Sequence, residues 1–184
     1  NENSIKINYM PILLGGLLKL AGIKANVDIP IKGKYMVKDC RLLAEKYNVK
    51  VGYHAHLQAS DTAWDFALSS SENNYANLDI GHYIAAGGDN TKETLLKFIE
   101  KNHSRICSLH LKDRQASKSS NYVGSDNQIW GQGDTPIKEV LLLMQKNSYD
   151  FTATIELEYR IPDGSTPVKE VIKCMDYCKA VLNS

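Results

Sequence analysis

Four short segments of this 184-residue chain carry side chains that bind metal ions or transfer protons. They are His54-Ala55-His56, Asp79-Ile80-Gly81-His82, His110-Leu111-Lys112-Asp113 and Glu156-Leu157-Glu158. Each segment is followed by a stretch with helical character. Imidazoles and carboxylates are ligands of catalytic divalent cations, and an imidazole also exchanges protons near neutral pH. The pattern therefore predicts one polar site whose parts are far apart in the sequence.

The elements that must position these side chains follow from the hydrophobic pattern. Short apolar runs predict four strands, which are Val49–His56, Tyr75–Ile80, Ile106–Leu111 and Phe151–Leu157. The first is rich in β-branched and aromatic residues and is expected to be buried. A helix is expected before it, with an apolar face made of Met36, Cys40, Leu43 and Tyr47.

Cap signals predict where the later helices begin. Asn90 and Glu93 have the spacing of a capping box, ahead of a face made of Leu95, Leu96 and Ile99. Thr135-Pro136 and Thr166-Pro167 each predict an N-cap followed by a first-turn proline. The faces of the last two helices are expected to be Ile137, Val140, Leu141 and Met144, and Val168, Val171, Ile172, Met175, Cys178 and Leu182.

Apolar strands that alternate with amphipathic helices predict an α/β fold with a parallel sheet, of the (β/α) TIM-barrel type. An eight-unit barrel needs about 250 residues, so this chain corresponds to its last four to five βα units. We treat residues 1–184 as a single domain. Residues 1–33 are poorly assigned, with Ile5–Leu14 and Lys24–Ile29 as weaker strand candidates. A partial barrel leaves two open sheet edges, so the chain is either part of a longer barrel or forms a homo-oligomer.

Composition narrows the partners. The net charge is +1, with 22 basic and 21 acidic residues, which favours a small neutral substrate and argues against nucleic acid. The apolar stretch Met10–Leu20 is interrupted and too short to cross a membrane. Four cysteines without CxxC spacing indicate a reducing, cytoplasmic location. Export after signal removal stays open, because the chain begins with Asn-Glu-Asn.

Five motifs resemble, in order and spacing, those of the xylose isomerase-like barrel superfamily of sugar phosphate isomerases and epimerases. They are Tyr53-His54-Ala55-His56, Leu78-Asp79-Ile80-Gly81-His82, Ser108-Leu109-His110-Leu111-Lys112-Asp113-Arg114, Gly131-Gln132-Gly133-Asp134 and Ile155-Glu156. The resemblance extends from about Tyr35 to Leu182, over the last four strands. It implies that Asp79, His110 and Glu156 hold a divalent metal ion. Mixed carboxylate and imidazole ligands suit Mn²⁺, Mg²⁺, Co²⁺ or Zn²⁺.

The sequence departs from this family at the tip of the predicted strand Val49–His56. The family commonly has a glutamate there, which is both a ligand and an acid/base group, whereas this chain has His54 and His56. Alternate residues of a strand face the same side, so both imidazoles can point inward. We expect one of them, His54 in our assignment, to replace the missing ligand. Both are candidates for a catalytic base beside Glu156.

A second set of residues is predicted to bind the substrate: His82, Lys112, Arg114, Glu158 and Trp130. Lys112 and Arg114 offer positive charge to an oxyanion or a phosphate, and Arg114 matches a position that often contacts substrate in the family. Gly131 and Gly133 are expected to let the backbone approach a ligand. Each residue also has an ordinary alternative. The histidines could be hydrogen-bonded core residues, Lys112 and Arg114 solvated loop charges, and Trp130 a packing residue.

These residues predict a metal-dependent isomerase or epimerase that removes a proton next to the carbonyl of a sugar or keto-sugar, through a metal-stabilised enediolate. The first alternative is a metal-dependent lyase or hydratase that acts on keto-sugars or keto-glycosides by β-elimination. The second is a truncated barrel that binds without turnover. An apurinic-site endonuclease is disfavoured by the balanced charge. Asp113 and His103 are expected to be structural and surface residues, respectively.

Overall fold

The protein is described by a computed structural model that covers residues 30–56, 59–117 and 126–184. The strands are β1 (Val51–His54), β2 (Asn74–Asp79), β3 (Ile106–Leu111), β4 (Asp113–Arg114), β5 (Asn127–Gln128) and β6 (Thr152–Ile155). The helices are α2 (Pro30–Tyr47), α3 (Asp65–Ser70), α4 (Ile80–Ala85), α5 (Lys92–Asn102), η2 (His103–Arg105), α6 (Ile137–Asn147) and α7 (Pro167–Leu182). The candidate strands Ile5–Leu14 and Lys24–Ile29 lie outside the described residues.

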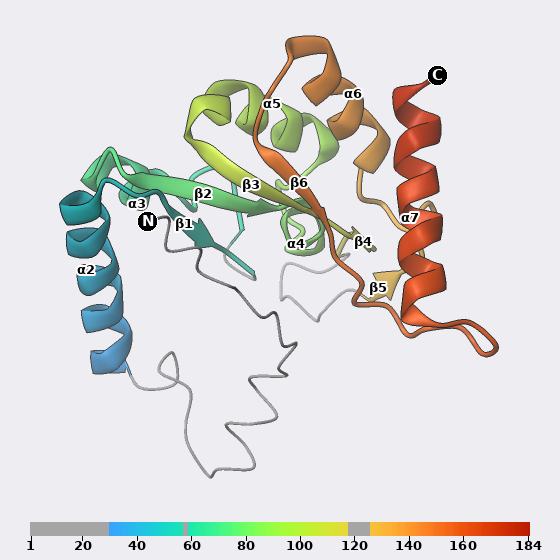
Figure 1. Cartoon of the computed structure of the whole chain (residues 1–184), viewed down its shortest axis with the longest axis horizontal. Helices are drawn as coiled ribbons and strands as arrows, with labels where there is room; N and C mark the ends of the chain where they lie inside the picture. Colours follow the sequence, from blue (N-terminus) through green and yellow to red (C-terminus); the bar gives the residue numbers. More distant parts are fainter. Residues whose placement is uncertain (1–29, 57–58, 118–125) are drawn as a thin grey trace, which may run out of the picture.

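Four strands form a parallel sheet in the order β1-β2-β3-β6, which is also their order along the chain (Figure 1). Parallel neighbours need a crossover connection, and helices supply it between successive strands. This confirms the predicted α/β class with a TIM-barrel-type sheet. The polar loop after β3 adds a small antiparallel pair, β4 with β5, that the sequence pattern did not predict.

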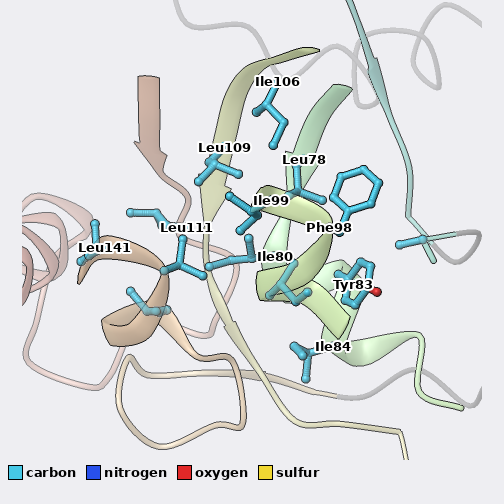
Figure 2. Close-up of a cluster of buried hydrophobic side chains, with 14 of the residues drawn as sticks. Leu78, Ile80, Tyr83, Ile84, Phe98, Ile99, Ile106, Leu109, Leu111 and Leu141 are labelled. Carbon is cyan, nitrogen blue, oxygen red and sulfur yellow. The ribbon is translucent and has the colours of Figure 1, made fainter. Parts of the chain in front are cut away.

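The two faces of this sheet differ in chemistry. The face covered by helices carries the hydrophobic core, in which Leu78, Leu109 and Leu111 lie with Ile99 (Figure 2). Leu95 of α5 belongs to the same buried cluster. The opposite face carries polar rows that cross the strands. One row is His54, Asn77, Ser108 and Thr152, and the next contains Asp79, His110 and Thr154. Paired residues of neighbouring strands share a face, so the rows place these polar groups together.

Two helix starts differ from the predictions. The capping box of α5 uses Thr91 and Thr94, because the Asn90 amide instead donates to the carbonyls of Ala59 and Tyr83. Helix α6 begins after Pro136 without a side-chain cap, because the Thr135 hydroxyl accepts a hydrogen bond from the Arg114 N–H. In both cases a tertiary hydrogen bond outweighs the local cap.

The start of α7 was predicted correctly. The Thr166 side chain accepts from the Lys169 N–H, and Pro167 follows in the first turn. A proline is well tolerated there because the first N–H groups of a helix have no intrahelical partner.

The predicted burial of the outer elements is partly wrong. Leu43 and Tyr47 of α2 are exposed, as are Val168, Ile172, Met175 and Leu182 of α7. The two helices lie at opposite ends of the sheet in Figure 1. There α2 contacts the end strand β1, and the buried residues of α7 are Glu170, Cys174 and Val181. Strand β1 is likewise a half-exposed end strand rather than a buried one.

A buried carboxylate ties the segment after β6 to α7. Glu170 is fully buried and accepts hydrogen bonds from Tyr159 Oη at 2.9 Å and Ser165 Oγ at 2.5 Å, while Lys173 Nζ lies 2.7 Å away. The hydrogen bonds from Lys173 and Ser165 lower the pKa of Glu170 to about 2. Tyr159 lies next to Glu158, so this contact also fixes the segment that carries the polar residues after β6. No helix in the described ranges is long and apolar enough to cross a membrane.

We predict that Glu170→Gln lowers the free energy of unfolding at neutral pH. The neutral amide has one accepting oxygen instead of two and no negative charge, so it cannot replace the carboxylate as the partner of Tyr159, Ser165 and Lys173. The folded-state pKa of Glu170 lies below its usual value, so its stabilisation is present above that value and is lost as the pH falls from about 4.5 towards about 2. Urea unfolding of both proteins at pH 7 and near pH 3 tests this. Glu139→Gln, which alters an exposed carboxylate, is the control. A difference that stays constant over this range contradicts the prediction.

Candidate active site

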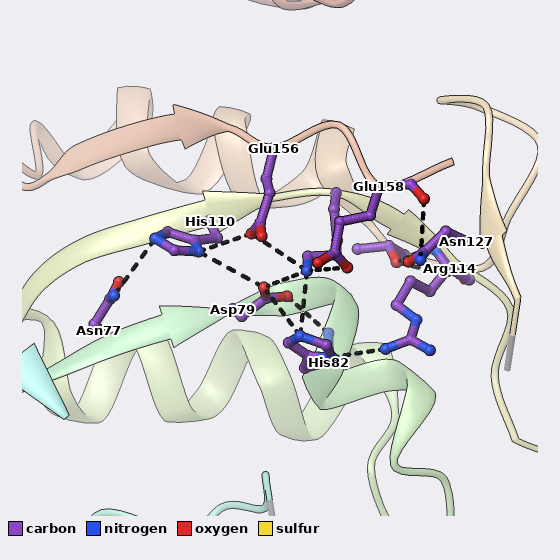
Figure 3. A network of polar contacts seen from close by, with 10 residues as sticks. Asn77, Asp79, His82, His110, Arg114, Asn127, Glu156 and Glu158 are labelled. Carbon is purple, nitrogen blue, oxygen red and sulfur yellow. Dashed lines mark hydrogen bonds and ion pairs between the residues drawn. The ribbon is translucent and has the colours of Figure 1, made fainter. Parts of the chain in front are cut away.

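The predicted site residues gather at the C-terminal ends of the parallel strands (Figure 3). Asp79 is the last residue of β2, and its partner in the sheet register is His110 of β3. His54 is the last residue of β1, and Glu156 directly follows β6. The sheet thus brings together the four residues that were proposed to hold a metal ion.

Asp79 links the site to the fold. Its side chain is fully buried. The Oδ1 atom accepts a hydrogen bond of 2.8 Å from the His82 backbone N–H and so caps α4. The Oδ2 atom lies 3.0 Å from Lys112 Nζ. One carboxylate therefore starts a helix and anchors the ammonium group at the same time.

Lys112 is a buried cation held among carboxylates. Its side chain is 2% exposed, and Nζ lies 2.7 Å from Glu158 Oε2 and 3.2 Å from Glu156 Oε2, in addition to Asp79. Burial opposes the charge, but Asp79 and Glu158 outweigh it and raise the pKa of Lys112. Burial acts to raise the pKa of Glu158, but the hydrogen bond from Lys112 outweighs it and lowers that pKa. The reading of Lys112 as a solvated loop charge is wrong, because the charge is enclosed.

His82 is a buried neutral imidazole. Its pKa is lowered to about 3 by burial and then by the charge of Lys112, with smaller contributions from His56 and Arg114. Arg114, itself 8% exposed, places NH1 2.7 Å from His82 Nδ1. On the other side of the ring, Lys112 Nζ lies 3.2 Å from Nε2. A guanidinium and an ammonium group can only donate, so both ring nitrogens of His82 face cationic donors. That Nε2 lies 3.7 Å from Asp79 Oδ2.

The geometry fits a divalent cation bound by His54, Asp79 and His110. Each offers one ligand atom, and these atoms lie within 4.8 Å of one another. Two ligand atoms on one metal ion are at most about 4.2 Å apart, so only a small contraction is needed. Burial lowers the pKa of His54, which keeps its lone pair available. Glu156 Oε2 lies 2.8 Å from His110 Nδ1 and adjoins this group.

A second cluster of His54, His56 and His82 also lies within such distances. Its ring geometry is unfavourable, because the His56 and His82 rings are stacked at 4.3 Å with an interplanar angle of 28°. A metal ion binds in the plane of an imidazole, along its nitrogen lone pair, and two stacked rings cannot share such a position. His56 therefore lies beside the cation cluster rather than in it.

The glycine-containing loop before α6 is organised by Asp113 rather than by a ligand. Asp113 Oδ2 accepts from the N–H groups of Gly131 and Gly133 at 2.8 and 2.9 Å, and Oδ1 accepts from that of Thr135 at 3.2 Å. A Cβ atom on Gly133 would overlap the Asp113 carboxylate. The backbone thus comes close to a buried side chain, and the loop fixes the position of Arg114.

Three residues complete the comparison with the predicted site. Trp130 is buried, and its ring contacts Tyr177 edge-on at 5.9 Å, which is a packing role in this structure. Sequence reasoning missed Asn77 and Ser108, which lie in the polar row next to Asp79 and His110. Their alternation with these two residues on the same strands was the signal that could have identified them.

Comparison with known proteins agrees with this geometry. Residues 21–178 match the sequence model of a protein family described as xylose isomerase-like TIM barrel. No protein with a curated description matches the chain.

Several solved structures share the fold. Mannonate dehydratase from Streptococcus suis serotype 2 has a TM-score of 0.63 and 18% identity, over 86% of this chain and 49% of that one. The IolI protein with a bound zinc atom has a TM-score of 0.62 and 15% identity, over 86% and 58%. D-psicose 3-epimerase from Clostridium cellulolyticum H10, solved with D-tagatose, has a TM-score of 0.57 and 15% identity, over 82% and 56%. The chain thus spans roughly half the length of these proteins.

We predict that Lys112→Met lowers the free energy of unfolding by about 3–5 kcal/mol in the presence of a chelator, because it leaves buried carboxylates without their counter-charge. The control is Lys92→Met, which breaks an exposed ion pair with Glu139 and should cost about 0–1 kcal/mol. Chemical denaturation of both variants measures the difference. Equal losses for the two lysines would mean that the Lys112 ammonium is not what stabilises the carboxylates.

Proposed function

The chain belongs to the xylose isomerase-like TIM barrel family, and on this premise we propose that it is a divalent-metal-dependent isomerase or epimerase of sugars or keto-sugars. The observation that carries the proposal is the convergence of His54, Asp79 and His110, with Glu156 beside them. A zinc-binding protein and a sugar epimerase of the same fold support it. The substrate class is therefore a small sugar.

We assign Asp79, His110, Glu156 and His54 as the metal ligands. Two carboxylates and two imidazoles suit Mn²⁺, Mg²⁺, Co²⁺ or Zn²⁺. A divalent ion held by these residues would act as a Lewis acid and would stabilise negative charge that develops on the substrate during proton abstraction. The described geometry leaves His54, Glu156 and His110 partly or fully accessible, so a substrate can reach the cluster.

The proton-transfer groups proposed are Glu156, His54 and His56. Glu156 follows the last strand of the sheet, whereas His54 ends the first strand and His56 lies two residues beyond it. These groups would therefore approach a substrate above Asp79 and His110 from two sides. A positioned base contributes roughly 10²- to 10⁴-fold to such a step. The polar residues His82, Lys112, Arg114 and Glu158 adjoin this space and are assigned to substrate binding and to charge stabilisation.

A lyase or dehydratase is the second candidate. The specific observation in its favour is the pair of histidines where the family commonly has a glutamate, since a histidine can protonate a departing hydroxyl at neutral pH. Mannonate dehydratase shares the fold. Non-catalytic binding is the third candidate, and the metal-binding experiment below separates it from the other two.

We predict that the purified protein binds one divalent cation per chain at the cluster. Asp79→Asn, which can still cap α4, and His110→Ala should each weaken binding of the cation by more than about 100-fold. Loss of a residue that only hydrogen-bonds to a metal ligand costs up to roughly 100-fold, and loss of a ligand itself should cost more. His103→Ala, a histidine stacked on Tyr149 outside the cluster, should bind as the wild type does. Elemental analysis and calorimetric titration provide the measurement. Failure of the wild type to bind any divalent cation would rule out the proposed enzyme.

We further predict that a sugar or keto-sugar substrate incubated with the loaded protein in D₂O gains deuterium on a carbon next to its carbonyl, because the proton passes through a base that exchanges with solvent. Mass spectrometry and NMR of the recovered sugar measure this exchange. Loss of water or of another leaving group, without a retained isomer, would select the lyase instead. Glu156→Gln should reduce the exchange rate by at least about 100-fold.

A further inference from the structure

A short hydrogen-bond chain lies behind His110 on the open face of the sheet. Ser108 Oγ donates to Asn77 Oδ1 at 2.7 Å, and Asn77 Nδ2 lies 3.4 Å from His110 Nε2 (Figure 3 shows the second contact). Asn77 and Ser108 are register partners in β2 and β3. Both side chains are half-buried, so solvent competes weakly for these contacts.

With the Asn77 amide oriented in this way, the two contacts of His110 agree on which ring nitrogen carries the proton. An amide nitrogen can only donate, so His110 Nε2 accepts and the neutral ring carries its proton on Nδ1. The Nδ1–H then points at Glu156 Oε2, 2.8 Å away, and lies 3.8 Å from Asp79 Oδ2. In this arrangement the nitrogen that faces the carboxylates is protonated and has no lone pair for a cation.

We propose that Asn77, supported by Ser108, is a positioning residue that switches His110 between two tautomers, one closed to a cation and one that accepts it. In the accepting arrangement the Asn77 amide is turned over. Its Oδ1 accepts from His110 Nε2–H, its Nδ2 donates to Ser108 Oγ, and Nδ1 presents its lone pair to the carboxylates. The ring loses a proton from Nδ1 and gains one at Nε2 through solvent, so its charge is unchanged.

The residue types suit this switch. A serine hydroxyl can donate or accept, and an amide offers one of each, so the chain keeps its hydrogen bonds in both directions. An aspartate at position 77 could only accept and would hold His110 in the Nε2–H form. A leucine at position 77 would have a similar size but could not hydrogen-bond to His110, so it would favour neither tautomer. The ligands of a metal ion are commonly oriented by such outer partners.

This inference rests on the proposed cation site, so the experiment separates the two. The tautomer of His110 can be measured in the metal-free protein by long-range ¹H–¹⁵N NMR with ¹⁵N-labelled histidine, using His110→Gln to assign its signals. We expect Nδ1–H in the wild type and Nε2–H in Asn77→Asp. Addition of Zn²⁺ should convert the wild type to the Nε2–H form.

Affinity provides the second measurement. Asn77→Asp should bind Zn²⁺ at least tenfold more tightly than the wild type, and Asn77→Leu more weakly. The new charge of Asp alone could tighten binding, so the control is Thr152→Asp, which places a carboxylate in the same row beside Ser108. The control should bind Zn²⁺ less tightly than Asn77→Asp and keep the Nδ1–H tautomer.

The outcomes are distinct. A metal-free wild type that already carries Nε2–H, or an unchanged tautomer in Asn77→Asp, overturns the role of Asn77 even if Zn²⁺ binds. Absence of Zn²⁺ binding by the wild type overturns the proposed function, while the metal-free spectra still decide whether Asn77 sets the tautomer. Circular dichroism of each variant identifies any that fails to fold, and Ser108→Ala then repeats the tautomer test from the other end of the chain.

Discussion

The Asp79 carboxylate is the contact on which both the fold and the site depend. Its two oxygens act in different places, one capping α4 and the other holding Lys112. Because the side chain is fully buried, water cannot take over either contact if one is lost. The motif around it follows from this arrangement. Gly81 has no room for a Cβ atom because Lys112 lies against it, and His82 is held by the cap.

The net charge of the site is relevant to the proposed cation and to the proposed carbonyl substrate. Asp79, Glu156 and Glu158 exceed the fixed cations Lys112 and Arg114 by one negative charge, since neutral His82 contributes none. A divalent ion turns this into an excess of one positive charge. In a partly enclosed site such an excess stabilises an oxyanion more strongly than it does in water. The charge that would develop on the substrate in the proposed proton abstraction is negative, opposite in sign to this excess.

Local patterns predicted the strands well, with Ile106–Leu111 correct at both ends and Asp79 and His110 brought together as expected. Features set by tertiary partners could not be predicted. The burial of Lys112 depends on carboxylates such as Glu158, 46 positions away in the sequence. Likewise, Asn90 lost its capping role to two distant carbonyls. A single sequence shows which residues can pair, but not which of several partners a side chain reaches.

At the end of β1 this chain has His54 and His56 where the family commonly has a glutamate, and this difference bears most directly on the proposed reaction. A glutamate there would supply a charged ligand and a second carboxylate base, whereas His54, as the proposed ligand, would be neutral and would leave the loaded site more positive by one charge. In the proposed site, His56 would then be the proton-transfer group at the β1 side of the sheet, and Glu156 the one at the β6 side. Isomerisation needs only a base that returns the proton, but elimination of a hydroxyl also needs an acid at neutral pH. An imidazole can serve as either, so a histidine at position 56 is compatible with both reactions.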